Sequence, residues 1–278
     1  MNKSLFTKIM LHGFVIIMIA LSVYPIFIMF FGSFKTAAEL ASNPGGIPQS
    51  PTFDNYVRLY TFQACIMLRT FFNAIFIAVL HTCIAVFISA MAGYAFAKYT
   101  FIGKTFIFLL FLATMMIPRE LLIPPLYISF AKIHWLNTYR VQIFPFIANV
   151  FAMFLLKQYM ESIPTAIIDA GRVDGAGEWS IFGRLVLPMA MPAIGVLWIL
   201  IFMEKWNDYL WPLMMVKSKE LLPIMVILPT LNDEASVWSV PWELVLAGCT
   251  IVTLPIMIAF FMFQDKFMSS VTIGAVKE

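Results

Sequence analysis

The sequence predicts an all-α membrane protein with six transmembrane helices and a cytoplasmic loop of two short helices. Of the 278 residues, 62% are hydrophobic and 12% are charged, about half the charged fraction of an ordinary soluble domain. The mean hydropathy is +0.90. The apolar residues form stretches long enough to cross a hydrocarbon core roughly 30 Å thick. We therefore expect one transmembrane domain over residues 1–278, although the length alone would suit two globular domains.

Six apolar stretches are each long enough to span the bilayer as a helix. They cover residues 11–34, 71–97, 105–130, 140–157, 190–216 and 244–264. The first is too long for the apolar region of a secretory signal peptide, so we expect it to remain as an anchor. An even number of spans places both termini on one side. The basic residues before the first span and in the turn from Lys98 to Lys104 favour the cytoplasm for both termini.

The second stretch contains small residues at every fourth position. They are Ala85, Ser89, Gly93 and Ala97. Such a face lets another helix approach closely where lipid offers no hydrophobic driving force. The partner helix is expected either in the same bundle or in a second subunit.

The third stretch is interrupted by prolines. Pro118, Pro124 and Pro125 remove backbone donors that lipid cannot replace, so this segment is expected to face protein or a water-filled cavity. Arg119 and Glu120 lie beside the break. We expect them either to pair with each other at the outer interface or to belong to a transport pathway.

A polar stretch over residues 161–188 separates the fourth and fifth spans. Ser162 followed by Pro164 is typical of a helix start. Apolar residues at helical spacing follow until Gly175 and Gly177 interrupt the pattern, after which a second short helix is expected. The polar side chains include more acids than bases, which suits a groove on a soluble partner better than an anionic membrane surface.

This stretch resembles the cytoplasmic signature loop of ABC importer permeases. The signature reads Glu-Ala-Ala, three residues, Gly, nine residues, and Ile-x-Leu-Pro. Here Asp169-Ala-Gly, Gly175 and Leu185-Val-Leu-Pro188 occupy the same spacing. The departures are Asp169 for Glu, Gly171 for the second Ala and Leu185 for Ile, and all three are conservative in size or charge.

Other segments are similar to the carbohydrate branch of that family, close to the smaller permease subunit of maltose-like importers. These segments are Ile163-Pro164, Asp174-Gly-Ala, Trp206-Asn-Asp-Tyr-Leu-Trp-Pro212 and Gly274-Ala-Val-Lys277. The resemblance covers essentially the whole chain. It implies a multi-pass, non-catalytic subunit of a bacterial or archaeal cytoplasmic membrane, surrounded by membrane lipid.

The resemblance also implies the partners and the residues that contact them. They are a second homologous permease, an extracytoplasmic solute-binding protein and two cytoplasmic ATPases, which bind ATP and Mg; this chain is expected to bind no cofactor. The binding protein would meet the external stretches 35–70 and 217–243. The loop 161–188 would be the coupling helix, and the tail 271–278 would reach the ATPase interface. The docking residues implied in the loop are Asp169, Ala170, Asp174, Gly175, Ala176, Trp179 and Phe182.

The fifth stretch contains ionisable residues, which are expensive within a membrane and therefore candidates for function. Glu204, Asn207, Asp208 and Trp211 recur at the spacing of one helical face. Carboxylates and an amide can bind hydroxyl groups, and an indole can stack on a sugar ring. This predicts a pathway for a sugar or oligosaccharide, with Lys205 opposite either acid; a polyol or glycerol phosphate is the alternative solute. The other interpretation of this face is a polar network between helices.

Several other function classes are disfavoured. The basic residues are too dispersed for binding nucleic acid. The three cysteines are far apart, and the three histidines stand singly, so neither a metal site nor a catalytic site is expected. Gly103-Lys104-Thr105 lacks the upstream glycine of a phosphate-binding loop. A secondary transporter is the alternative from a different class, but the sequence shows no convincing internal repeat.

Overall fold

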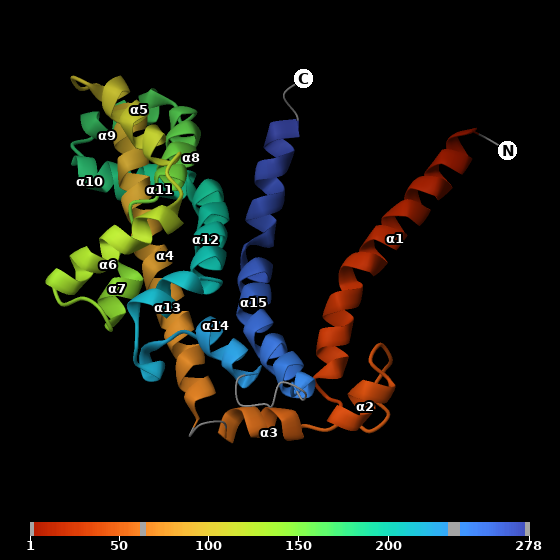
Figure 1. Ribbon diagram of the computed structural model, residues 1–278. Helices are drawn as coiled ribbons and strands as arrows, with labels where there is room; N and C mark the ends of the chain where they lie inside the picture. The colour runs from red at the N-terminus through yellow and green to blue at the C-terminus, as the bar shows by residue number, and fades with distance from the viewer. Residues whose placement is uncertain (1–2, 62–64, 233–239, 276–278) are drawn as a thin grey trace. The chain divides into compact units, whose positions relative to one another are not determined.

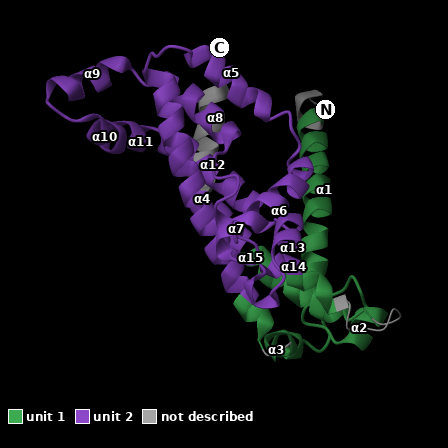
Figure 2. Cartoon of the chain, turned by 60° about the vertical axis from the view of Figure 1, so that its left-hand side comes forward, with its two compact units in different colours: residues 1–69, 227–254 green, residues 70–226, 255–278 purple. Residues whose placement is uncertain are grey.

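The computed structural model describes residues 3–61, 65–232 and 240–275 (Figure 1). Within these ranges every regular element is a helix. The last three residues of the predicted tail 271–278, and residues 233–239 of the predicted external stretch 217–243, lie outside the described residues. The chain forms two compact units, one of residues 1–69 and 227–254 and the other of residues 70–226 and 255–278 (Figure 2).

The first unit contains the N-terminal helix and the segment that follows it. Its elements are α1 (Lys3–Gly32), α2 (Ala37–Ser42), α3 (Asp54–Thr61), the 3-10 turn η4 (Leu228–Asn232) and the first part of α15 (Trp242–Ala275).

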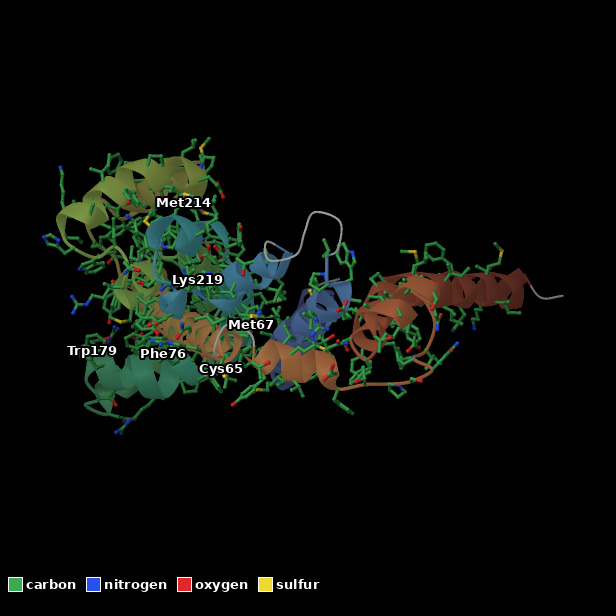
Figure 3. The ribbon with its side chains drawn as sticks, turned by 60° about the horizontal axis from the view of Figure 1, so that its bottom comes forward. Cys65, Met67, Phe76, Trp179, Met214 and Lys219 are labelled. Atoms are coloured by element: carbon green, nitrogen blue, oxygen red, sulfur yellow. The ribbon has the colours of Figure 1, made fainter. Side chains whose placement is uncertain are left out.

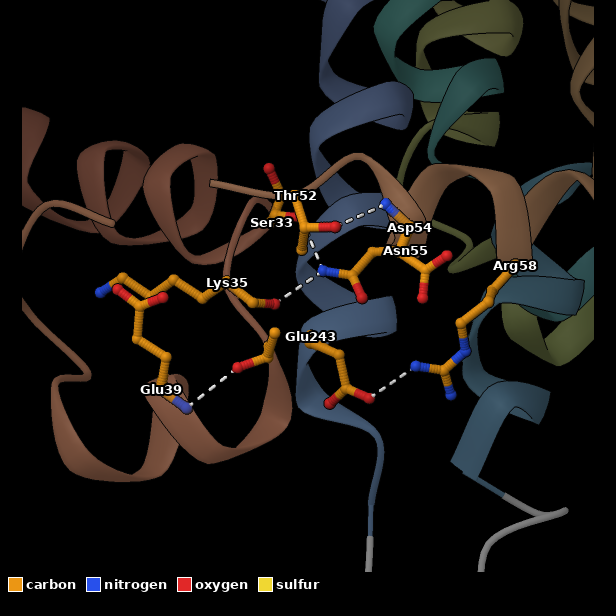
Figure 4. Close-up of polar contacts among 9 residues, drawn as sticks. Ser33, Lys35, Glu39, Thr52, Asp54, Asn55, Arg58 and Glu243 are labelled. Carbon is orange, nitrogen blue, oxygen red and sulfur yellow. Dashed lines mark hydrogen bonds and ion pairs between the residues drawn. The ribbon is translucent and has the colours of Figure 1, made fainter. Parts of the chain in front are cut away.

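Side chains bonded to backbone carbonyls hold the turn after α1. The buried Lys35 donates from Nζ to the carbonyl oxygens of Asn43 at 2.5 Å and Gly46 at 2.7 Å. Asn55 Nδ2 donates to the Lys35 carbonyl oxygen at 2.8 Å, and Arg58 pairs with Glu243 at 3.2 Å (Figure 4). The carbonyl oxygens of Asn43 and Gly46 satisfy the Lys35 ammonium group, whose charge would be costly to bury alone.

The second unit contains most of the helices. Its elements are α4 (Ile66–Lys98), α5 (Lys104–Thr114), η1 (Arg119–Leu122), α6 (Ile123–Lys132), α7 (Tyr139–Ile143), α8 (Val150–Glu161), α9 (Thr165–Val173), α10 (Glu178–Ile181), the π-helical turn η2 (Phe182–Val186), α11 (Leu187–Met189), α12 (Met191–Trp206), α13 (Leu210–Met215), η3 (Lys219–Leu221) and α14 (Ile224–Ile227). The end of α15 is also assigned to this unit.

Three helices among the described residues have the length and composition to cross a membrane. They are Thr7–Gly32, Ile66–Lys98 and Trp242–Met262, which correspond to the first, second and sixth predicted spans. Two bent pairs would raise the number to five, namely Lys104–Thr114 with Arg119–Lys132 at 90° and Glu178–Met189 with Met191–Trp206 at 79°. The break predicted from the prolines of the third stretch is therefore confirmed. The number of membrane crossings stays a prediction.

Two of the predicted spans, 140–157 and 190–216, each contain two helices. In the first stretch α7 ends at Ile143 and α8 begins at Val150, where Asn149 caps it by accepting from the Ala152 N–H at 2.9 Å. In the second, α12 ends at Trp206 and α13 begins at Leu210. Pro145 lies in the break between α7 and α8, and Pro212 lies in the first turn of α13, where a missing backbone N–H leaves no helical hydrogen bond unmade.

The small-residue face of α4 packs against α8 of the same chain. A Cβ atom on Gly93 would lie 3.0 Å from both Leu156 Cβ and the Lys157 backbone nitrogen. Ser89 Oγ donates to the Asn149 carbonyl oxygen at 3.2 Å. Ala85 and Leu156 are fully buried in the same apolar cluster. Of the two expectations for this face, a contact within the bundle is therefore the one observed.

Replacing Gly93 by valine is expected to destabilise the protein. The added methyl groups would meet the backbone of α8, and overpacking of this kind typically costs about 1–3 kcal/mol. We expect a lower thermal unfolding midpoint in a fluorescence assay of the detergent-solubilised protein. Gly13→Val is the matched control, because a Cβ at that helical glycine meets no atom within 4 Å. Equal midpoints for the two variants would contradict the close contact.

Candidate functional site

The chain between α8 and α12 folds into two short helical arms joined by a tight bend, as the sequence predicts. The first arm is α9, which ends at Val173, and the second arm consists of α10, η2 and α11. Between them, Gly175 adopts φ +77°. The Ala176 N–H donates to the Gly171 carbonyl oxygen at 2.9 Å, and the Gly175 N–H donates to that of Arg172 at 3.0 Å. This pair of bonds closes the helix end around a left-handed residue. Glycine is the residue that adopts such a conformation without strain, so Gly175 permits the bend.

The two arms approach closely at Gly171. A Cβ at this position would lie 3.0 Å from Leu185 Cδ1 and 3.4 Å from Ile181 Cγ1. Gly171 and Leu185 are two of the three departures from the signature pattern, and they face each other. The smaller residue in one arm thus leaves space for the longer side chain in the other.

Most of the predicted docking residues lie on the surface of the bend. Asp169, Ala170, Asp174, Gly175 and Trp179 are exposed, and Ala176 is half-buried. Trp179 is 72% exposed (Figure 3). Val173, at the end of the first arm, is 87% exposed. The expected docking surface therefore includes one apolar side chain that sequence reasoning did not select.

Phe182 is the exception among the predicted docking residues. It is only 5% exposed. Its ring lies 5.4 Å from that of Tyr94 and 6.4 Å from that of Phe87, both on α4. Phe182 therefore anchors the second arm to α4, and its ring is not part of the exposed surface.

A salt bridge joins the two arms across the bend. Arg172 Nε donates to Glu178 Oε1 at 2.8 Å, and its NH1 group donates to Asp169 Oδ1 at 3.1 Å. The guanidinium beside Glu178 lowers the pKa of that carboxyl group, and the carboxylate raises the pKa of Arg172. Both groups are consequently charged at neutral pH.

A second feature of the same unit is a cavity of about 220 Å³ with a charged lining. The lining residues with ionisable or aromatic side chains are His81, Arg119, Glu120, Phe146, Glu204, Lys205, Asp208 and Trp211. Three of the four predicted pathway residues are among them, and Asn207 is not. The prediction of one continuous face is wrong because α12 ends at Trp206. Asn207 is exposed and donates from Nδ2 to the Met203 carbonyl oxygen at 2.8 Å.

Four charged residues of the cavity form two ion pairs. The Glu204 carboxylate accepts a hydrogen bond from Arg119, whose guanidinium lies 5.1 Å from the centre of the Phe146 ring. Lys205 Nζ donates to Asp208 Oδ2 at 2.8 Å, as the sequence suggested for a basic residue opposite an acid. The expected pairing of Arg119 with Glu120 is not the one observed, because the bend after α5 turns Arg119 toward α12.

Two lining residues show the limits of the sequence reasoning. Trp211 donates from Nε1 to the Val141 carbonyl oxygen at 2.7 Å, and its ring is buried, 5.0 Å from that of Phe146, so its N–H is already engaged within the protein. His81 was treated as an isolated histidine, but it is buried beside the cavity, with Nδ1 2.7 Å from the Ile143 carbonyl oxygen. One feature of the sequence indicated that His81 faces the bundle. His81 lies four residues before Ala85 and so continues the small-residue face of α4.

The chain is similar to known proteins in both sequence and fold. Residues 85–272 match the family described as "Binding-protein-dependent transport system inner membrane component". The arabinooligosaccharides transport system permease protein of Bacillus subtilis is 34% identical over 273 residues, covering 97% of this chain and 96% of that protein. The lactose transport system permease protein of Rhizobium radiobacter is 30% identical and covers 92% of each chain.

A solved structure has the same fold. It is the crystal structure of a bacterial ABC transporter involved in the import of the acidic polysaccharide alginate, and one of its chains matches with a TM-score of 0.84. The identity is 21%, and the match covers 95% of this chain and 98% of that one. With the family match and the relatives above, it follows that this chain belongs to the family of inner-membrane components of binding-protein-dependent transport systems, the permease subunits of ABC importers.

Proposed function

We propose that this chain is the transmembrane permease subunit of an ATP-driven, binding-protein-dependent importer of a sugar or oligosaccharide. The observation that carries this proposal is similarity along nearly the whole chain to a permease for arabinooligosaccharides. Further relatives are named for lactose and for starch degradation products. In this proposal the chain forms half of the translocation pathway and hydrolyses no ATP itself.

The proposed topology has six membrane crossings with both termini in the cytoplasm. The basic residues of the N-terminal segment and of the turn from Lys98 to Lys104 support it. The loop 161–188 then lies on the cytoplasmic side between the fourth and fifth crossings. In this topology α5 with α6 forms the third crossing, α7 with α8 forms the fourth and α12 with α13 forms the fifth, because broken helices are tolerated where they face protein or water.

The proposed partners are a second homologous permease, two cytoplasmic ATPases and an extracytoplasmic binding protein. ATP and Mg would be bound by the ATPases, and the loop 161–188 would insert into a cleft on one of them. Asp169, Ala170, Asp174 and Trp179 would supply the contact surface, since they are exposed at the bend. Gly175 and Ala176 would shape the bend, with Phe182 as its anchor on α4. The described parts of 35–70 and 217–243 would face the binding protein.

We assign the solute pathway to the cavity lined by Glu204, Asp208 and Trp211, with Asn207 outside its lining. Two of its three acids, Glu204 and Asp208, are paired with Arg119 and Lys205. Such a cavity offers hydrogen-bond donors and acceptors without the excess positive charge that would attract an anion. This favours a neutral sugar over glycerol phosphate. ATP binding would move the loop, and the bundle would alternate between inward-facing and outward-facing states.

The proposal is tested by ATP hydrolysis and uptake in liposomes containing the complete importer. Binding protein is added with arabinotriose, lactose, maltotriose or glycerol phosphate, one at a time. We expect one of the sugars to stimulate hydrolysis roughly 5-fold to 150-fold, the usual range of allosteric coupling. Stimulation by glycerol phosphate alone would contradict the sugar assignment. Uptake by this chain without the ATPases would contradict the importer assignment and indicate a secondary transporter.

A further inference from the structure

The last residue of α4 and the residue after it contact the loop 161–188 at two places, before its first arm and at the start of its second arm. Lys98, the last residue of α4, donates from Nζ to the carbonyl oxygens of Ile163 at 2.5 Å and Glu161 at 3.3 Å, which lie just before the first arm. The next residue, Tyr99, donates from its hydroxyl to the Glu178 carboxylate, at the start of the second arm. Two consecutive residues therefore hold the loop on both sides of its bend.

The contact at Glu178 is part of a larger cluster. The same carboxylate accepts from Arg172 at 2.8 Å, and the Arg172 guanidinium lies 6.0 Å from the centre of the Tyr99 ring. Burial and the neighbouring carboxylate raise the pKa of Tyr99, so its hydroxyl remains a donor at neutral pH. Hydrogen bonds to a charged acceptor are stronger than neutral ones.

Aromatic contacts continue from this cluster beneath the second arm. The Tyr99 ring lies 5.5 Å from that of Tyr94, which in turn lies 5.4 Å from that of Phe182. A cavity of about 150 Å³ remains among these rings, Glu178 and Trp179. The polar contacts of Tyr99 therefore add to the packing of Phe182 in holding the second arm against α4.

The same helix reaches the charged cavity. α4 runs without interruption from Ile66 to Lys98, and His81 on this helix lines the cavity. At a rise of about 1.5 Å per residue, His81 and Lys98 lie roughly 25 Å apart along the helix axis. A continuous helix therefore connects the loop with the cavity.

We propose that Lys98 and Tyr99 are positioning residues that make the loop 161–188 and α4 move as one body, so that displacement of the loop reaches the cavity through α4. This inference rests on the proposed function, in which the ATPase displaces the loop. Contacts on both sides of the bend, together with the packing of Phe182 on α4, restrain rotation of the loop relative to α4.

The inference is tested in the assembled importer with Tyr99→Phe and Lys98→Met. Each variant removes the donor and keeps most of the side chain. We expect complex yield and basal ATP hydrolysis to be unchanged, while stimulation by binding protein with arabinotriose, lactose or maltotriose falls by at least about fivefold. Tyr127→Phe, which alters another tyrosine of the same unit, is the matched control. Wild-type stimulation in both variants would overturn the inference.

A conservative variant separates positioning from folding. Glu178→Gln keeps an acceptor oxygen for Tyr99 and is expected to retain most of the stimulation that Glu178→Leu loses. If Tyr99→Phe and Glu178→Leu both fail to assemble, the inference is overturned, because the contact would then be a requirement of folding.

A distance measurement tests the inference without any sugar. Spin labels are placed on Ala166→Cys, in the exposed first turn of α9, and on the exposed native Cys83 of α4, with Cys65 and Cys249 replaced by alanine. ATP is expected to leave this distance unchanged in the otherwise wild-type complex and to shift it in Tyr99→Phe. A shift without Tyr99→Phe would overturn the inference. Absence of stimulation by every sugar in the wild type would instead count against the proposed function.

Discussion

Replacing Gly175 by valine is expected to abolish the stimulation of ATP hydrolysis in the assembled importer while leaving membrane insertion intact. Gly175 has φ +77°, a left-handed conformation that costs a residue with a side chain roughly 1–2 kcal/mol, and a β-branched residue is especially unsuited to it. A valine would relax toward negative φ and break the bonds from Ala176 to Gly171 and from Gly175 to Arg172. The surface formed by Asp174 and Trp179 would then be lost.

The neighbouring glycine provides the control. Gly177 lies at φ −68° and ψ 156°, an extended conformation open to any residue, and a Cβ there meets no atom within 4 Å. Gly177→Val should therefore retain most of the stimulation. Gly175→Asn should be intermediate, because asparagine tolerates the left-handed region better than valine does. Equal activities for Gly175→Val and Gly177→Val would show that the bend does not transmit the signal.

The helices and the bend were predictable because their signals are local. Runs of apolar residues identified α1, α4 and α15. Pro164 marked the start of α9, and Gly175 ended it. In each case the physical cause lies within a few residues of its effect, whether it is the length needed to cross a bilayer or a backbone conformation that glycine allows.

The breaks within two predicted spans were harder to predict because hydropathy does not register a change in chain direction. The segment between α7 and α8 is apolar, and its left-handed residue is Phe146 at φ 65° rather than a glycine. Tertiary packing sustains such a conformation, and the local pattern does not indicate it. The end of α12 at Trp206 was likewise not predicted. The helical spacing therefore wrongly placed Asn207 on one face with Asp208.

One of the two ion pairs of the cavity depends on a contact between distant segments. Arg119 and Glu204 are brought together by the bend between α5 and α6, and their spacing in the sequence contains no sign of this. Gly171 and Leu185 give a contrasting example. Their departures from the signature pattern appear independent in the sequence, and the structure shows that one compensates for the other.

Replacing Asp208 by asparagine is expected to lower both stability and transport. The partner side chain, Lys205, is only 9% exposed, so the substitution leaves a largely buried ammonium group without its counter-charge. Removing one member of a buried ion pair typically costs about 3–5 kcal/mol. We expect a lower thermal unfolding midpoint for the detergent-solubilised complex and little uptake in liposomes. Asn207→Ala is the matched control, because its exposed amide bonds only to a carbonyl of the preceding helix, and surface changes of this kind usually stay within about 0.5 kcal/mol.

A paired substitution separates the two roles that Asp208 can have. Lys205→Met with Asp208→Leu removes both charges, and replacing a buried ion pair by apolar residues of similar size is often neutral or stabilising. If the pair lines the solute pathway, this variant should recover the unfolding midpoint but not uptake, because the cavity has lost groups that bind hydroxyls. Recovery of both properties would assign Lys205 and Asp208 to helix packing alone. A wild-type midpoint for Asp208→Asn would contradict the burial of Lys205 on which both expectations depend.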